Sequence, residues 1–196
     1  MAIGYRHGLS GSRRRFVAIV LAAATLLPTG SFGLDRDGSR VEFFVKDNRG
    51  GFTGVVRDVT ATVTVTEHEG GFSGDVEARI DARTITTGIG VRDRQMRADF
   101  LQTSRYPFIT FRGTAAPAAR PGGLPFRAVL RGRLTIKATT REVEVPIRVT
   151  ALKGAYLAEG QLTVKMSDFG IPIPRFLVFV AEDPVTITLK VRFLQK

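Results

Sequence analysis

Residues able to do nucleophilic, acid–base or metal chemistry are scarce in this sequence. Its 196 residues include no cysteine and two histidines, His7 and His68. Without cysteine there is no disulfide, no thiolate metal site and no thiol nucleophile. No Gly-x-Ser-x-Gly motif is present, and proton transfer would fall to Asp93, Asp99 or Asp168, which show no recognisable pairing. The sequence therefore favours a binding protein over an enzyme, and we expect no metal site and no cofactor.

Arginines near residues 88–102 are the side chains best suited to bind an anion. Arg92, Arg94 and Arg97 lie in this stretch, and Arg175 lies in a later proline-rich segment. A guanidinium group can donate two parallel hydrogen bonds to a phosphate. The alternative is a solvated basic face, and we favour it. For Arg92 and its neighbour Asp93 we expect an ion pair that fixes a helix, rather than contacts with a ligand.

The N-terminal residues have the pattern of an export signal. Residues 1–15 carry four arginines and no acid, and an apolar run covers residues 16–27 and ends at Pro28. This run is shorter than the about 20 residues that a spanning helix needs, and small residues follow it. We predict a signal peptide over residues 1–33, cleaved after Gly33, so that no stable membrane span remains and the protein is periplasmic. The alternative is an uncleaved membrane anchor. Residues 12–17 (SRRRFV) also resemble a twin-arginine motif, so both export routes stay open.

The net charge of +11 does not indicate nucleic-acid binding. Cleavage after Gly33 removes four arginines and no acid, and the remaining arginines are spread along the chain. No basic motif interleaved with aromatic residues is present. Together with export, this argues against a nucleic-acid partner.

Alternation of apolar and polar residues recurs through the rest of the chain. One apolar and one polar face per strand is typical of antiparallel sheets, and glycine-rich turns separate the runs. The alternating runs cover residues 40–46, 59–66, 75–81, 130–137, 142–150, 162–166 and 185–193. The fold class is therefore all-β, and about eight strands form a sandwich or an up-and-down barrel. A barrel of this size can hold one elongated ligand.

Two segments depart from this pattern. Val91 or Arg92, Met96 and Phe100 have the spacing of a short amphipathic helix within residues 88–102. Residues 168–180 hold two prolines and eight phenylalanine, isoleucine, leucine or valine residues. Prolines at this spacing forbid a central strand, yet the segment is too apolar for a solvated loop. We expect it to fold over the mouth of an apolar space.

A series of motifs follows in order along the chain: residues 39–46 (SRVEFFVK), 50–54 (GGFTG), 80–88 (IDARTITTG), 92–96 (RDRQM), 100–101 (FL), 106–111 (YPFITF), 132–137 (GRLTIK), 139–143 (TTREV), 167–171 (SDFGI) and 183–187 (DPVTI). Their order and spacing resemble the YceI-like family of exported, lipocalin-like barrels that bind polyisoprenoid lipids. The resemblance covers essentially all of residues 34–196. Two histidines common in the family are replaced here, by Asp47 and Gln95, so any role of those histidines is not carried over.

The resemblance implies one lipocalin-like barrel over residues 34–196, with a short helix at one end, that binds a polyisoprenoid or other long-chain lipid. Burying such a tail is favourable by about 0.8 kcal/mol per methylene. The side chains expected around the tail are Val41, Phe43, Val45, Ile80, Ile89, Met96, Phe100, Leu101, Ile109, Phe111, Leu134, Ile136, Leu162, Val164, Phe169, Ile171, Phe176, Leu177, Phe179 and Ile187. Candidate contacts to a lipid head group are Arg92, Asp93, Arg94, Arg97 and Arg175.

Three alternatives remain open at this point. The inward side chains of a small barrel can fill its core and leave no cavity, as in a structural or stress-linked interaction protein. An enzyme acting on a lipid head group is a second alternative. Exposed strand edges and the additional outward Phe44 also leave open a homodimer.

Overall fold

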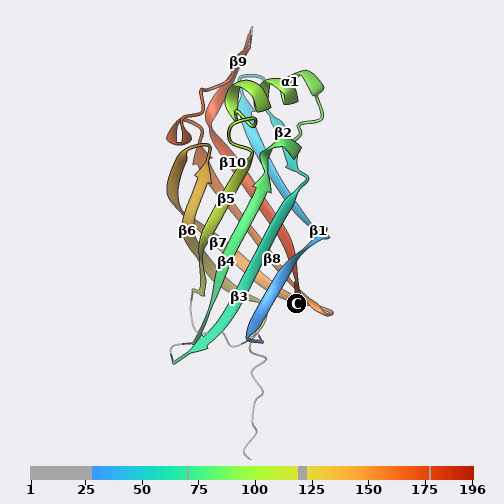
Figure 1. The fold of residues 1–196 in the computed structure, drawn as a ribbon, viewed down its shortest axis with the longest axis vertical. Helices are drawn as coiled ribbons and strands as arrows, with labels where there is room; N and C mark the ends of the chain where they lie inside the picture. The colour runs from blue at the N-terminus through green and yellow to red at the C-terminus, as the bar shows by residue number, and fades with distance from the viewer. Residues whose placement is uncertain (1–27, 70, 119–122, 177) are drawn as a thin grey trace, which may run out of the picture.

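The computed structural model describes residues 28–69, 71–118, 123–176 and 178–196 and shows one antiparallel β-barrel (Figure 1). Ten strands alternate with short turns, and the helical segments gather at one end. The strands are β1 (Gly30–Asp47), β2 (Phe52–Val56), β3 (Val59–His68), β4 (Gly71–Asp81), β5 (Phe108–Pro117), β6 (Phe126–Ile136), β7 (Thr139–Leu152), β8 (Ala155–Lys165), β9 (Arg175–Phe176) and β10 (Phe179–Gln195). The predicted all-β barrel with a short helix at one end is confirmed.

Pairing between β1 and β10 closes the barrel. The order around it is β1, β3, β4, β5, β6, β7, β8 and β10, with every neighbour antiparallel. The long strand β1 has two partners on its other side: residues 30–33 pair with β3, and residues 41–45 pair with β2. Closure leaves the eight barrel strands without free edges along most of their length, which removes a route to aggregation.

Alternation decides which side chains face inward. In β3, Val63 and Val65 line the interior while Thr64 and Thr66 are exposed. The same pattern in β4, β6 and β10 gives the barrel an apolar interior and a polar surface. β-Branched residues are common in these strands because their side chains pack well on a pleated surface.

Helical turns and a proline-rich segment cover one end of the barrel, which we call the cap end. The turns are η1 (Ala82–Thr84), helix α1 (Gly90–Gln95) with its continuation as a π-helical turn η2 (Met96–Phe100), and η3 (Ser167–Phe169). The loop before β2 and the β9–β10 hairpin lie at the same end (Figure 1). The predicted helix over residues 88–102 corresponds to α1 and η2, and the proline-rich segment is not a barrel strand.

Pro146 marks a place where two barrel strands separate. The ladder between β7 and β8 runs over residues 147–152 of β7, whereas β8 continues to pair with β10 up to Lys165. Proline has no N–H to donate to a neighbouring strand. Beyond Pro146, η3 lies against both strands, and Arg141 Nε donates to the Asp168 carbonyl oxygen at 3.0 Å.

The first part of β1 was not expected from the sequence. Residues 30–33 pair with β3, residues 32–35 pair with β10, and Phe32 is buried with 3% of its surface exposed. The expected boundary between Gly33 and Leu34 therefore falls inside β1. Residues 1–27, the greater part of the predicted signal peptide, lie outside the described residues.

Candidate ligand cavity

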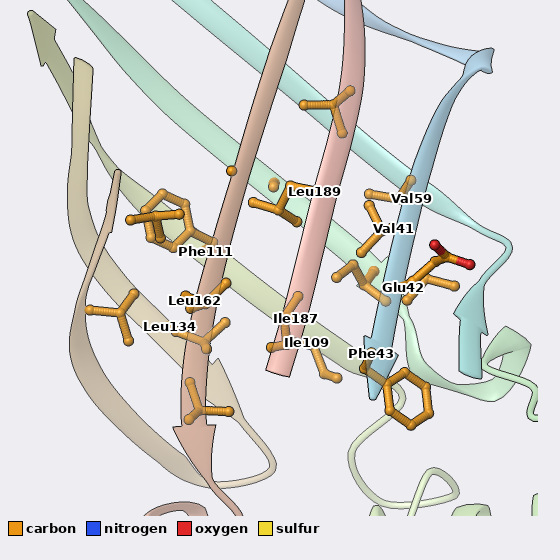
Figure 2. Close-up of a pocket in the computed structure, with 18 of the residues that line it drawn as sticks. Val41, Glu42, Phe43, Val59, Ile109, Phe111, Leu134, Leu162, Ile187 and Leu189 are labelled. Carbon is orange, nitrogen blue, oxygen red and sulfur yellow. The ribbon is translucent and has the colours of Figure 1, made fainter. Parts of the chain in front are cut away.

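The barrel encloses a cavity of about 760 Å³. This volume lies within the usual range for sites that bind small molecules. Side chains from β1, β5, β6, β8 and β10 extend into the same interior space, among them Val41, Ile109, Leu134, Leu162 and Ile187 (Figure 2). The cavity argues against the alternative of a filled barrel.

Small residues explain why the interior is not filled. Ala61, Ala78 and Gly74 face inward on β3 and β4, and Ala128 and Ala158 do so on β6 and β8. An inward alanine or glycine leaves the volume that a leucine or phenylalanine would occupy in a packed core. The backbone ladders keep the barrel wall in place around this space.

A cluster of aromatic residues closes the end of the barrel opposite the cap. Phe32, Phe72 and Phe193 are buried there together with Val65. The ring of Phe32 meets that of Tyr156 edge to face, with 5.5 Å between the centroids, and Phe72 packs in the same way against Phe126, also at 5.5 Å. Such pairs add to the stabilisation from burial alone. This cluster, the aromatic plug, forms the closed end of the cavity.

The cavity reaches the surface at the cap end, beside the start of α1. Ile89 and Val91 line the cavity and are also 54% and 65% exposed. Among the described residues, no other large apolar side chain of the lining is classed as exposed. A ligand in the cavity therefore has its exit next to α1.

Asp93 anchors this helix to the barrel. Its carboxylate is 6% exposed and accepts hydrogen bonds from the Thr86 hydroxyl at 2.6 Å, from the Thr87 amide at 2.7 Å and from the Thr87 hydroxyl at 2.6 Å. The Thr86 backbone in turn pairs with Val55 of β2. Burial alone would raise the pKa of Asp93, but the Thr86 and Thr87 hydrogen bonds, aided by the charge of Arg97, outweigh it and lower the pKa.

The five candidate head-group residues have different surroundings. Arg92 lines the cavity, and its guanidinium lies 3.9 Å from the centroid of the Phe52 ring. Arg97 is half-buried and donates to the Ile85 carbonyl oxygen at 3.1 Å, while Arg94 and Arg175 are exposed and lie outside the lining. Asp93 is engaged by the threonines. Thus the structure brings only Arg92 of this set to the cavity.

The expected ion pair between Arg92 and Asp93 is wrong. Within the described residues, Arg92 Nε donates instead to the Thr87 hydroxyl at 2.8 Å, and that hydroxyl donates to Asp93. Consecutive helical residues point in different directions, so the carboxylate turns toward the barrel while the guanidinium turns toward Phe52.

Seventeen of the twenty side chains expected around a lipid tail line the cavity. They are Val41, Phe43, Val45, Ile80, Ile89, Met96, Phe100, Leu101, Ile109, Phe111, Leu134, Ile136, Leu162, Val164, Phe169, Ile171 and Ile187. Leu177 and the side chains of Phe176 and Phe179 lie outside the described residues.

Sequence reasoning missed the aromatic plug and, apart from Arg92, the polar members of the lining. Phe32 was assigned to the signal peptide, and Phe72 follows a turn glycine outside the clear alternation. The lining is otherwise apolar; its charged or polar members are Glu42, Asp47, Arg92, Gln95, Tyr156 and Lys165. Glu42 forms an ion pair with Arg40 at 2.6 Å, and this hydrogen bond lowers the pKa of Glu42.

The described residues contain no group of three or more histidine or acidic side chains placed to hold a metal ion. None of the helices described is long and apolar enough to cross a bilayer. The chemistry that the cavity offers is mainly apolar contact, with a few polar side chains in its lining, among them Arg92 and Gln95 of α1.

Comparison with solved structures finds the same barrel in several bacterial proteins. Burkholderia cenocepacia BcnA is 23% identical, with a TM-score of 0.69 over 81% of this chain and 98% of BcnA. A Saccharophagus degradans domain described as polyisoprenoid-binding is 15% identical, with a TM-score of 0.65 over 84% of this chain and 98% of that domain. The Campylobacter jejuni YceI protein is 17% identical, with a TM-score of 0.58 over 73% of this chain and 84% of that protein. At these identities the likeness shows the fold.

A search among curated proteins found no match. The model of the YceI-like domain, however, matches residues 32–193, which is nearly the whole of the described barrel. The match begins at Phe32 of the aromatic plug and ends at Phe193, its partner in the same cluster. This chain belongs to the YceI-like family.

Proposed function

We propose that this protein is an exported, non-enzymatic lipid-binding protein of the periplasm that holds the tail of a long isoprenoid lipid in its barrel. The observation that carries the proposal is the apolar cavity of about 760 Å³, closed at one end by the aromatic plug and open beside α1. A long apolar tail gains about 0.8 kcal/mol for each methylene that it buries there. The Saccharophagus degradans domain of the same fold, described as polyisoprenoid-binding, supports this ligand class.

The geometry also supports an orientation for the ligand. The apolar tail points toward the plug, because the lining from Phe111 and Leu134 inward is apolar. The polar head lies at the opening beside α1, the helix that contributes Arg92 and Gln95 to the lining. Transport or storage of the lipid then requires only binding and release, for which no reacting group is needed.

The direct test is to find the ligand. The protein is isolated from the envelope of an expressing bacterium and examined by native mass spectrometry, followed by lipid extraction. We expect a long-chain isoprenoid lipid in near one-to-one ratio. Reproducible absence of any long-chain lipid under gentle conditions would refute the proposal.

A matched pair of variants tests whether the lipid occupies the cavity. Ala78→Phe places a ring inside the barrel, whereas Glu77→Phe places the same ring on the outer face of the same strand. Displacing about three methylene groups weakens binding by about 2.4 kcal/mol, or roughly fiftyfold. We expect the lipid to be lost from A78F and kept by E77F, and equal loss or equal retention in the two variants would place the lipid elsewhere.

A further inference from the structure

Apolar side chains are exposed on two segments of the cap end. Ile89 and Val91 lie at the start of α1, and Val178 and Val180 lie on the β9–β10 hairpin; Val178 is 57% exposed. Both segments are at the same end of the barrel (Figure 1). Exposed large apolar residues that gather at one end of a molecule mark an interaction surface.

Both segments are held in place by hydrogen bonds. The Asn48 side chain donates to the Val178 carbonyl oxygen at 2.8 Å and accepts from the Val180 amide at 3.2 Å. The α1 segment is held through Asp93, as described above. The apolar side chains are therefore displayed on a fixed framework, so that docking loses little conformational entropy.

This surface borders the opening of the cavity at Ile89 and Val91. Ile89 and Val91 belong both to the lining and to the exposed set. A lipid that leaves through water exposes its tail, and each exposed methylene lowers the equilibrium constant about fourfold. A bilayer placed against the opening avoids this exposure, because the tail passes from one apolar environment directly into another.

The charge of the cap end fits an anionic surface. The helical turns, the loop at residues 48–51 and the hairpin at residues 175–180 carry six arginines (Arg49, Arg83, Arg92, Arg94, Arg97 and Arg175) against three acids (Asp93, Asp99 and Asp168). Asp93 is buried and turned toward Thr86 and Thr87, whereas Asp99 and Asp168 are exposed. The next acid along the chain, Glu182, forms an ion pair with Lys46 at 2.7 Å, so the cap end keeps a net positive charge. Arginines beside exposed apolar side chains are typical of surfaces that bind membranes containing anionic phospholipids.

We propose that the cap end docks on an anionic phospholipid bilayer, with Ile89, Val91 and Val178 inserted at the head-group level, and that the bound lipid enters and leaves through this contact. The proposal rests on the proposed lipid-binding function. It adds the partner and the orientation: the barrel stands on the membrane with its opening toward the bilayer and its aromatic plug away from it.

The absence of tryptophan from the sequence makes the orientation measurable. Single tryptophans are introduced as Val91→Trp, Val178→Trp and, at the opposite end of the barrel, Leu152→Trp, where the native side chain is 44% exposed. Each variant of the envelope-isolated protein is mixed with phosphatidylglycerol vesicles that contain brominated lipid. We expect a blue shift and quenching at positions 91 and 178 and neither at 152. No shift at either cap position, or an equal shift at 152, overturns the proposal.

A pair of charge variants tests the electrostatic part. Arg94→Gln with Arg175→Gln removes two cap arginines that lie outside the cavity lining, and Arg127→Gln with Arg148→Gln removes two exposed arginines from the barrel wall. Each arginine near an anionic surface contributes about fivefold to binding. We expect about 25-fold weaker vesicle binding in the first double variant, little change in the second, and weaker binding at high salt. Equal effects of the two double variants would contradict the proposal.

Two further outcomes separate this inference from the proposed function. If the bound lipid is found by mass spectrometry but the cap tryptophans do not respond to vesicles, docking fails and lipid binding stands. If the cap binds vesicles but no bound lipid is ever found, docking stands and the proposed lipid-binding function fails. A concentration-dependent blue shift of V91W without vesicles, together with a doubled mass in light scattering, would assign the surface to a second copy of the chain and overturn membrane docking.

Discussion

The N-terminal part of β1 provides a sharp test of how the barrel is held together. We compare a chain that begins at Gly30 with one that begins at Leu34, the start expected from the signal-peptide pattern. Residues 30–33 form the whole ladder between β1 and β3, and Phe32 and Gly33 also pair with the end of β10. Their loss leaves residues 62–65 of β3 paired only with β4 and removes Phe32 from the aromatic plug.

The magnitude follows mainly from Phe32. Truncation of a buried phenylalanine to alanine costs about 3–5 kcal/mol, and Phe32 is among the most buried residues of the barrel. For a domain of this size, each kcal/mol lowers Tm by about 2–4 °C. The chain that begins at Leu34 should therefore melt about 6–20 °C below the one that begins at Gly30, and the lost ladder hydrogen bonds add to this difference.

Thermal melts followed by circular dichroism measure the effect, with two substitutions in the longer chain as controls. Phe32→Ala should reproduce most of the loss, whereas Phe44→Ala, a 40% exposed phenylalanine on the same strand, should change Tm little. If the chain that begins at Leu34 melts within about 2 °C of the longer one, a loss of less than about 1 kcal/mol, the role given to Phe32 is wrong. We also expect the intact mass of the exported protein to place its N-terminus at or before Gly30, and an N-terminus at Leu34 would contradict this.

Three further predictions concern the anchor of α1, a close strand contact and the ligand. Asp93→Asn should lower stability by about 1.5–3 kcal/mol at neutral pH, because a charged acceptor of hydrogen bonds from Thr86 and Thr87 is lost. The pKa of Asp93 is lowered in the folded state. Its contribution to stability is therefore complete above the unfolded pKa of about 3.9 and is lost as the pH falls through the folded pKa. The Tm difference between wild type and D93N should shrink below about pH 4. Gly113→Ala should cost about 1–3 kcal/mol in urea unfolding, because the added methyl would meet the backbone of β6, whereas Gly90→Ala, whose methyl has no contact closer than 3.7 Å, should be neutral or stabilising. Removal of a bound lipid should lower Tm. The corresponding loss in the free energy of unfolding is about 4 kcal/mol if the lipid was present at 1,000 times its Kd, and adding the lipid back should restore Tm.

Each of these predictions has an outcome that would contradict it. A D93N protein with a pH-independent Tm difference would mean that the carboxylate charge does not stabilise the cap. Equal stability of G113A and wild type would mean that β5 and β6 can separate at no cost. A Tm that does not change on delipidation would mean that the lipid binds the folded and unfolded chains equally.

The alternation of side chains made most of the barrel predictable from sequence. Each run of inward valines and outward threonines or charged residues became a strand, because one buried face fixes both the periodicity and the register. The first part of β1 could not be found in this way. The residues of β1 that follow it, 34–39, read LDRDGS, and β1 has an irregular register with β10 between Asp35 and Arg40. A bulge interrupts the period of two on which the reasoning depends.

The arginines illustrate why the candidate site was only partly predictable. The spacing of Val91 or Arg92, Met96 and Phe100 identified the face of α1 and η2 that turns toward the cavity, and all four residues line it. Arg94 and Arg97 are on other faces of the same helix and lie outside the cavity lining, which their charge alone could not show. Arg175 lies in a hairpin whose position depends on Asn48, a contact between residues far apart in the chain. Charge can be read from sequence, whereas the direction of a side chain depends on tertiary structure.

Whether the inward side chains line a cavity or fill a core depends on their size rather than on their pattern. Ala61 and Ala78 face each other across β3 and β4, and Ala78 also pairs with Phe111. Small inward residues on β3 and β4 leave space that the ring of Phe111 on the neighbouring strand β5 does not fill. Because the barrel is closed by backbone ladders between β1 and β10, the space need not collapse when it is empty. The opening at Ile89 and Val91 is where an isoprenoid chain would pass between this space and the apolar interior of a bilayer. The lipid-binding and membrane-docking proposals therefore depend on the same two residues.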